Sequence, residues 1–581
     1  MDVPLILQNV SLPEAATLFF NGLVLSPADD GTVKRSTWLR IEAGLVREIG
    51  TGQPPAEARQ GAVERDLKGG VVLPGLADSH AHMYATGKQR RSVDLTGCSS
   101  IEELQGRLRK RVESSSAKDA QTVLEGTGWD QTLLGRDPTR ADLDAVVGDR
   151  PAVIHRRCWH VATASSAALR FCGALPEAPD VEGGVVERDA AGPTGVLREA
   201  AIEKVLKPLL ELEEPRELQK EILLRGLTEC VQRGITQVQS NDGKQLGNIG
   251  NPWKIYSELE AEGKLPCRVF LTVPYKEVGN GQQPAGPQQH PSGLLSCHRV
   301  KLWTDGALGA STAAVLEPYS DDPEGKNLGV LQLSPEEISE AVAGAKAKGL
   351  RVECHTIGDR SAKVLLDAFE KHLTPADRPL LTHCQILNDN LVSRMAAIGA
   401  IANVQPQFVP SDLPIVRSRL GESTERMRYA YAWRTLLHRG VRLAGGSDSP
   451  VEEPAPLVGM ADAMDHVIHE GERLSFAEAL EIYTAGAAFA AGAEDQLGRL
   501  EPGFAADLVL LHMPGVVGAE AQLPDAKALR EAQVLEVYVQ GRLVHSSDGS
   551  WPGLGIPFCG AAGKGGLIGH WRRGRCPCCR W

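Results

Sequence analysis

Two histidines lie one residue apart where an apolar segment ends, in the stretch VVLPGLADSHAHMYATG (residues 71–87). Side chains at positions i and i+2 of a β-strand point to the same side, so His80 and His82 would converge on one point. Imidazole is the commonest protein ligand for transition metals at neutral pH. The spacing indicates a metal site, although each histidine on its own is equally explained by a hydrogen bond to a polar neighbour.

Four more side chains that bind divalent metals, or can be made to, lie in or just after similar apolar segments. Lys301 lies in HRVKLWTD, His355 ends RVECHT, His383 lies in RPLLTHCQ, and Asp448 follows VRLAGG. Any one of them alone is better explained by a salt bridge or a hydrogen bond. Six such residues near the ends of five strand-like segments are hard to explain by chance, so the set predicts a metal centre.

The segments that carry these residues alternate with helical stretches. From VVLPGLADSH onward there are eight strand-like segments, which include residues 235–240, 267–273, 298–305 and 351–356. Short buried strands that are fed by helices of about three turns are typical of a parallel α/β sheet. Eight parallel strands can close into a (β/α)8 TIM-type barrel, whose active site lies at the C-terminal ends of its strands. The sequence therefore predicts an α/β barrel with the six residues at its mouth.

Composition argues against several kinds of partner. The 581 residues include 42% hydrophobic and 23% charged residues, as in globular proteins, and the net charge is −12. A negative chain is not expected to bind nucleic acid or an anionic membrane. No apolar run approaches the roughly 20 residues of a membrane span, and the N-terminus lacks the basic region of a secretion signal. Twelve cysteines, mostly scattered, favour reduced thiols and a cytoplasmic location.

The ordered set HAH, Lys, His, His and Asp on strands one, four, five, six and eight resembles the amidohydrolase superfamily. More narrowly, the chain is similar to the amidohydrolase-3 branch, which includes the N-substituted formamide deformylases. The resemblance covers roughly residues 17 to 545. The matching stretches include LPGLADSHAH, GPTGVLREA, VKLWTDGALGASTA, CHTIGDRSAKVLLDAFE, LTHCQIL, IANVQPQFV, GSDSPVE and GRLEPGFAADLVLL.

This resemblance implies a particular domain organisation. A barrel over residues 71–490 would carry an insertion over its mouth at about 84–200. Residues 17–70 and 491–546 would form a small composite β-sandwich from both chain ends, and both are rich in strand-like segments. There, Asn21-Gly22 and Gln540-Gly541 predict tight hairpin turns. The Gly-, Pro- and Arg-rich residues 547–581 are predicted to be a disordered tail, without a well-spaced metal set among Cys576, Cys578 and Cys579.

The resemblance also implies an activity, which is hydrolysis of carbon–nitrogen bonds other than peptide bonds. The substrate would be a small-molecule amide, such as a linear amide or an N-substituted formamide. His80, His82, His355 and His383 would hold one or two divalent metal ions, with zinc expected. Hydroxide on the metal would attack the substrate, because a bound cation lowers the pKa of water to about 7. Asp448 would bind the metal and carry the proton to the leaving nitrogen. A homodimer is common among the relatives.

Lys301 has two alternative roles under the resemblance. In binuclear members of the superfamily the equivalent lysine is carboxylated and bridges two metals, which requires a neutral amine. If Lys301 stays an ammonium ion, it would repel a second metal, and the site would hold one ion. Asp305 lies on the same face of the strand and is a candidate to touch the substrate, or else a capping residue after the strand.

Substrate recognition would involve the insertion. It supplies Trp129, His160 and Glu199 as candidates to touch the substrate, and by resemblance His160 falls in the pocket. Trp129 is better explained as a core residue. Glu199 could instead bind the metal, but it is better explained as a surface carboxylate or as one that supports the site.

Two alternatives to amide hydrolysis stay open. The same metal site could carry out a deamination or open a cyclic amide. In a different class, the chain could be a catalytically silent relative with a structural or interaction role. Silent relatives typically lose a ligand histidine or the final aspartate, and this sequence retains the full set.

Overall fold

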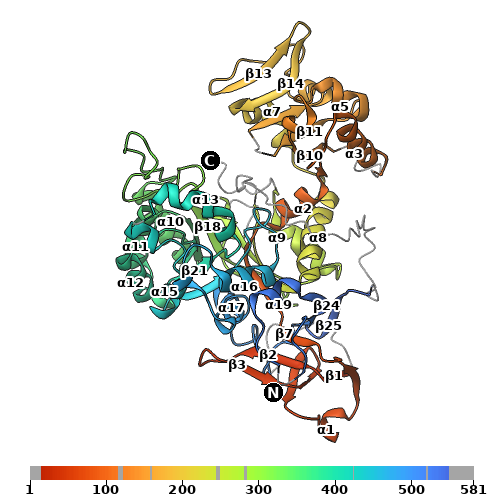
Figure 1. Ribbon diagram of the computed structural model, residues 1–581, viewed down its shortest axis with the longest axis vertical. Helices are drawn as coiled ribbons and strands as arrows, with labels where there is room; N and C mark the ends of the chain where they lie inside the picture. Colours follow the sequence, from red (N-terminus) through yellow and green to blue (C-terminus); the bar gives the residue numbers. More distant parts are fainter. Residues whose placement is uncertain are drawn as a thin grey trace.

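Eight parallel strands form the centre of the molecule (Figure 1). The computed structural model describes residues 15–114, 122–157, 160–243, 249–279, 284–422, 424–518 and 521–548. The strands follow one another around the sheet in chain order, which confirms the predicted barrel. They are β8 (Leu76–Ala81), β15 (Ile235–Asn241), β16 (Arg268–Pro274), β18 (Leu295–Trp303), β19 (Arg351–Thr356), β20 (Leu380–His383), β21 (Ile401–Val404) and β22 (Arg442–Gly445). The short β17 (Gln288–Gln289) pairs antiparallel at the side of β18.

The first and last strands of this sheet meet through polar contacts just after β22. The Asp78 carboxylate accepts hydrogen bonds from the backbone N–H and the hydroxyl of Ser447, at 3.0 and 2.5 Å. The backbone N–H of Asp448 donates to the carbonyl of His80 at 2.7 Å. These bonds bring β8 against the end of β22, so the barrel is nearly closed and the two strands that carry His80 and Asp448 are neighbours.

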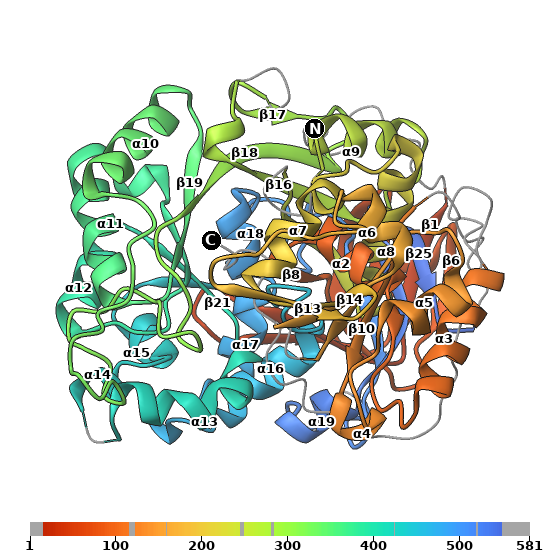
Figure 2. The same cartoon turned by 90° about the horizontal axis from the view of Figure 1, so that it is seen from above.

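Helices cover the outside of the barrel and bury their apolar faces against it (Figure 2). The start of α10 shows how the sequence sets a helix boundary, because Ser334 and Glu337 form a reciprocal capping box with Pro335 in the first turn. No helix among the described residues is long and apolar enough to cross a membrane. The main covering helices are α8 (Arg216–Gln232), α9 (Pro252–Ala261), α10 (Pro335–Ala347), α11 (Asp359–His372), α12 (Asp389–Ala397), α15 (Trp433–His438), α17 (Phe476–Ile482) and α18 (Ala485–Ala491).

The segment predicted as the first barrel strand is in fact two strands. Residues Val71–Pro74 form β7, which pairs with strands of a separate sheet, and only Leu76–Ala81 belong to the barrel. Gly75 separates them, and a side chain there would clash with Thr236. One apolar run therefore crosses from one sheet into another and then carries the two histidines.

That separate sheet is half of a β-sandwich built from both chain ends. Phe19, Val24 and Leu508 are among the buried residues that fill the space between its two sheets. The Gln540-Gly541 turn joins the paired strands β24 and β25 as predicted. Asn21-Gly22 does not make a hairpin, because the strands on either side of it belong to different sheets. One sheet contains β5 (Leu45–Gly50), β4 (Trp38–Glu42), β1 (Ala16–Phe20) and β6 (Ala62–Asp66), and the other contains β25 (Arg542–Ser546), β24 (Gln533–Val539), β23 (Leu508–His512), β7, β2 (Leu23–Pro27) and β3 (Val33–Ser36).

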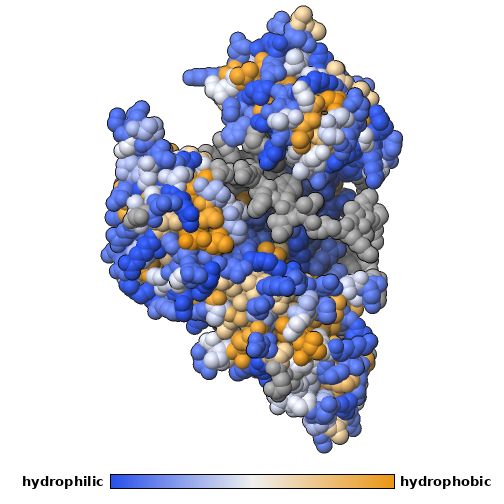
Figure 3. Space-filling view, viewed as in Figure 1, coloured by the Kyte–Doolittle hydropathy of each residue, from blue (hydrophilic) through white to orange (hydrophobic). Residues whose placement is uncertain are grey.

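The insertion forms a third body with its own six-stranded sheet. It follows α2 (Met83–Arg91), precedes α8, and buries two hydrophobic clusters of its own. The surface is hollowed between this body and the side of the barrel that carries α10 and α13 (Phe408–Leu420) (Figures 1 and 3). In sheet order its strands are β13 (Gly184–Asp189), β14 (Gly192–Glu199), β12 (Val161–Ala164), β11 (Ala152–Arg156), β10 (Leu124–Trp129) and β9 (Val93–Asp94), and its helices include α3 (Ile101–Glu113), α5 (Arg140–Val147), α6 (Ser166–Phe171) and α7 (Ala200–Leu210).

The predicted tail lies almost entirely outside the described residues, which end at residue 548. The three cysteines near the C-terminus are among the residues not described.

Candidate functional site

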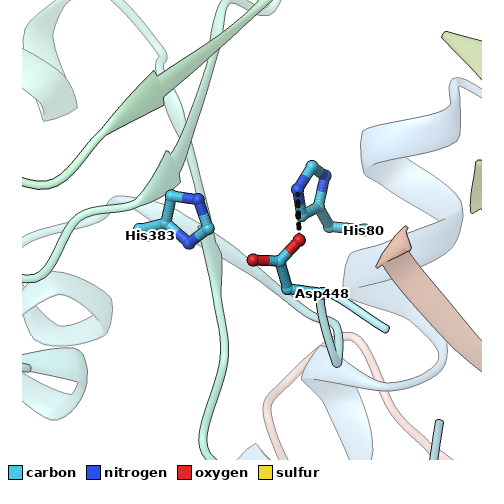
Figure 4. Close-up of side chains that lie close together, drawn as sticks. All are labelled: His80, His383 and Asp448. Carbon is cyan, nitrogen blue, oxygen red and sulfur yellow. Dashed lines mark ion pairs between the residues drawn. The ribbon is translucent and has the colours of Figure 1, made fainter. Parts of the chain in front are cut away.

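Five of the six predicted metal-binding residues meet in one buried cluster at the C-terminal ends of the barrel strands. The nearest donor atoms of His80, His383 and Asp448 all lie within 4.8 Å of one another. Figure 4 shows the Asp448 carboxylate between the rings of the two histidines. The rings of His82 and His355 adjoin these, with centroids 5.2 Å from His80 and 4.6 Å from His383. All five residues are at most 2% exposed, so solvent does not satisfy their polar atoms.

Each of the four imidazoles has one nitrogen fixed by an oxygen acceptor outside the cluster. For His82 and His355 the acceptors are the backbone carbonyls of Asn241 and Gly306, and for His80 and His383 they are the side chains of Glu353 and Gln405. A nitrogen that donates to such an acceptor leaves the other nitrogen with a free lone pair, and this fixes the tautomer and the ring orientation. The distances are 2.9 Å for His82 Nδ1, 3.0 Å for His355 Nε2, 2.8 Å for His80 Nδ1 and 2.8 Å for His383 Nδ1.

The remaining nitrogens face one another and the carboxylate. His82 Nε2 and His80 Nε2 lie 3.0 and 3.2 Å from Asp448 Oδ1. His383 Nε2 lies 3.1 Å from His355 Nδ1, so two lone pairs confront each other. A tetrahedral zinc ion with bonds of about 2.0–2.1 Å places its ligand nitrogens about 3.3 Å apart. The donor set therefore fits a divalent cation, which would relieve the repulsion between these lone pairs.

His355, His383 and Asp448 are held in the charge states that metal ligands need. For His80, burial and Lys301 lower the pKa, but Glu353 and Asp448 outweigh them and raise it above the ordinary value. Burial lowers the pKa of His355 to about 4 and holds the pKa of His383 well below its ordinary value, so both rings are neutral at neutral pH. Burial alone would raise the pKa of Asp448, but its contacts with His80 and His82 hold it well below the ordinary value. Neutral imidazoles and an ionised carboxylate are the forms that bind a cation.

Backbone strain is concentrated at two of these positions. His383 and Asp448 have φ angles of 83° and 57°, in the left-handed region that residues other than glycine rarely adopt. Cys384, next to His383, has a φ of 48°. Such conformations cost about 1–3 kcal/mol each and tend to persist at functional sites. The ends of β20 and β22, which carry two of the candidate ligands, therefore hold backbone conformations that their surroundings must stabilise.

Lys301, the sixth predicted ligand, lies deeper in the barrel and contacts a residue that was not predicted. Its Nζ is 2.9 Å from Oε1 of Glu353 and 3.5 Å from Nε2 of His80. Glu353 is completely buried on β19, two residues before His355. Lys301 therefore borders the cluster as one half of a buried ion pair.

Asp305 is held by the backbone of neighbouring loops. Its carboxylate accepts hydrogen bonds from the N–H groups of Ala314, Ile357 and Gly358, at 2.8 to 3.1 Å. Its nearest approach to the cluster is 3.6 Å, from Oδ1 to Nε2 of His355. Burial raises its pKa to about 7, although the three backbone N–H groups lower it. These contacts match the capping role that was considered for it.

The three candidates on the insertion have different surroundings. Trp129 is completely buried in one of the hydrophobic clusters of the insertion, where packing accounts for it. His160 and Glu199 form an exposed pair, with Nδ1 2.9 Å from Oε2 and side chains 43% and 56% exposed. Glu199 also has a positive φ, of 51°. His160 and Glu199 thus lie exposed on the insertion, whereas Trp129 lies inside it.

Sequence reasoning missed the side chains that orient the histidines. Glu353 and Gln405 act through contacts between different strands, so only the three-dimensional arrangement shows their partners. A signal existed for Glu353, because it lies two residues before His355 and therefore on the same face of a buried strand. An acidic residue at such a position needs a partner inside the barrel.

Comparisons with known proteins agree with this geometry. The profile of the amidohydrolase family matches residues 63–545. The putative amidohydrolase YtcJ of Bacillus subtilis is 31% identical over 547 residues, covering 91% of this chain and 99% of its own. The N-substituted formamide deformylase of Arthrobacter pascens is 25% identical over 535 residues, covering 88% and 95%. A solved structure of an uncharacterized metal-dependent hydrolase from Pyrococcus furiosus superimposes with a TM-score of 0.72 at 31% identity, covering 85% and 98%. The chain therefore belongs to the amidohydrolase family.

Proposed function

We propose that the protein hydrolyses carbon–nitrogen bonds other than peptide bonds, and that its substrates are linear amides, including N-substituted formamides. The observation that carries the proposal is the convergence of four oriented imidazoles and one carboxylate at the mouth of the barrel. The similarity to an N-substituted formamide deformylase over most of both chains supports the substrate class.

His80, His82, His355, His383 and Asp448 would hold a divalent ion, with zinc expected from the nitrogen-rich set. Such an ion supplies Lewis acidity, which polarises a carbonyl group and lowers the pKa of water. The anchored nitrogens keep the rings in place, so the ligands need little reorganisation. The ionised carboxylate of Asp448 accepts the proton from the attacking water and delivers it to the leaving nitrogen. Protonation of that nitrogen makes it a better leaving group.

The hollow between the barrel and the insertion gives a place for the substrate (Figure 3). We propose that the exposed pair of His160 and Glu199 contacts the part of the substrate that does not react. Under this proposal the insertion contributes to substrate affinity, and the residues of the barrel carry out the hydrolysis.

The test uses the purified full-length chain stripped of metal with a chelator and then reloaded with Zn²⁺. N-substituted formamides, longer linear amides, cyclic amides and amino-substituted rings are offered in parallel, and formate, amine and ammonia are measured. We expect activity on linear amides or formamides that disappears without metal and returns with it. Release of ammonia alone, or opening of rings alone, would replace the proposal with the deaminase or cyclic-amide alternative. A protein that takes up no stoichiometric metal would be a silent relative.

A further inference from the structure

Glu353 is buried among polar groups directly beneath the candidate metal centre. It is 0% exposed, and its Cα is the register partner of Lys301 on the neighbouring strand β18. His355, two residues later on the same face, reaches the centre itself. Glu353 therefore occupies the layer of the barrel interior that lies just below the histidines.

Donors surround this carboxylate completely. An ionised carboxylate buried to this degree needs both a counter-charge and hydrogen bonds, and here it has both. Oε1 accepts from His80 Nδ1 at 2.8 Å, Lys301 Nζ at 2.9 Å, Thr382 Oγ1 at 3.1 Å and Asn241 Nδ2 at 3.2 Å, and Oε2 accepts from Thr272 Oγ1 at 3.3 Å.

Glu353 contacts the side of the His80 ring that faces away from the candidate metal centre. It contacts His80 at Nδ1, whereas Nε2 of the same ring faces Asp448 at 3.2 Å. A carboxylate on the far nitrogen of a ligand histidine fixes the ring and makes its free nitrogen a stronger donor. The same carboxylate oxygen also binds Lys301. The Glu353 side chain thus orients His80 and forms an ion pair with Lys301.

We infer that Glu353 is a positioning residue for His80 and the buried counter-ion of Lys301, so that Lys301 belongs to this ion pair and the centre holds a single metal ion. The inference rests on the proposed metal-dependent function. A carbamate on Lys301 would place a second buried anion next to Glu353, and like charges at this distance disfavour each other. The ion pair instead leaves the four histidines and Asp448 as the ligand set.

The test measures metal binding, without substrate, in the full-length chain. Metal content and the Zn²⁺ dissociation constant, from competition with a chromophoric chelator, are compared for wild type, Glu353→Gln, Lys301→Met and the double variant. We expect one ion per chain in wild type and in Lys301→Met, and uptake that does not depend on bicarbonate. Glu353→Gln should weaken zinc binding about 10- to 100-fold, because it leaves the Lys301 charge unpaired beside His80. The double variant should recover most of that loss, because it removes both charges.

A matched control separates positioning from general stability. Asp507 and Arg268 form another buried ion pair, with 2.7 Å between Oδ2 and Nε, where β16 begins at the opposite end of the barrel. Asp507→Asn should lower the melting temperature but leave zinc affinity unchanged. The inference is overturned if Glu353→Gln binds zinc as tightly as wild type, if Lys301→Met loses the metal, or if wild type takes up two ions in a bicarbonate-dependent way. Failure of the proposed function would look different, as normal metal binding without amide hydrolysis.

Discussion

The barrel and the insertion bury different kinds of side chain. Inside the barrel, four histidines, Lys301, Glu353 and Asp448 are nearly or completely hidden from solvent and bond to one another. Inside the insertion the two clusters are apolar, and the polar pair of His160 and Glu199 is exposed. The barrel interior is therefore built for chemistry, which needs fixed and dry polar groups. The insertion is built as a separately stabilised body that offers polar groups to solvent.

The largest effect should come from the barrel. Asp448→Asn keeps the size of the side chain and an oxygen atom, but it cannot take a proton, so we expect turnover to fall by about 10³-fold. Metal should remain bound at saturating zinc. The measurement is product release together with metal content, with Asp507→Asn as a control. Unchanged turnover would remove the proton-transfer role.

A core substitution in the insertion should cost stability without touching the metal. Leu143 is completely buried in the cluster that also contains Trp129. Leu143→Ala should destabilise the insertion by about 2–5 kcal/mol, because it leaves a cavity. Hydrogen exchange measured by mass spectrometry should become faster in β10 and β11 and stay slow in the barrel strands. If the variant also loses its metal, the two regions are not energetically separate.

A smaller effect is expected at the exposed pair. His160→Ala should raise KM by about tenfold at most, the worth of one hydrogen bond, and should leave kcat nearly unchanged. A raised KM with an unchanged kcat indicates a contact that is equally strong in the ground state and in the transition state. Arg170→Ala, which breaks another surface ion pair of the insertion with Asp149, is the control. A drop in kcat without a change in KM would instead place His160 in the chemistry.

The smallest effect concerns pH. Burial raises the pKa of Asp142, but hydrogen bonds from Arg136 and Thr139 outweigh this and lower it below the ordinary 3.8. A carboxyl group whose pKa is lowered by folding stabilises the folded state at pH values above its unfolded pKa. This stabilisation is lost as the pH falls through the pKa of the folded state. Asp142→Asn should therefore destabilise α5 by about 1 kcal/mol at pH 7 and progressively less below pH 3.8. Hydrogen exchange of α5, corrected for intrinsic rates, would measure this, and a difference that persists in acid would contradict it.

Local patterns explain how much of the site the sequence could predict. His80, His82, His355, His383 and Asp448 lie in or next to short apolar segments, so a strand count is enough to place them at the barrel mouth. The partners of the orienting groups could not be found this way, because they lie on other strands, although the position of Glu353 two residues before His355 indicates a buried acid.

Two fold details also depended on tertiary contacts. Asn21 has the positive φ of a tight turn, as predicted, but the strands it joins pair in separate sheets of the sandwich. Gly75 divides one continuous apolar run between the sandwich and the barrel, because Thr236 packs against it. Within the run, only the Pro74-Gly75 pair marks the division.

The contact between Asp78 and Ser447 joins residues 369 positions apart in the chain. During synthesis the first two histidines emerge from the ribosome long before the carboxylate that completes their cluster. A chain cut short before Arg442 would lack both the closing strand β22 and the carboxylate of Asp448. The cluster can therefore assemble only after the last strand of the barrel has been made.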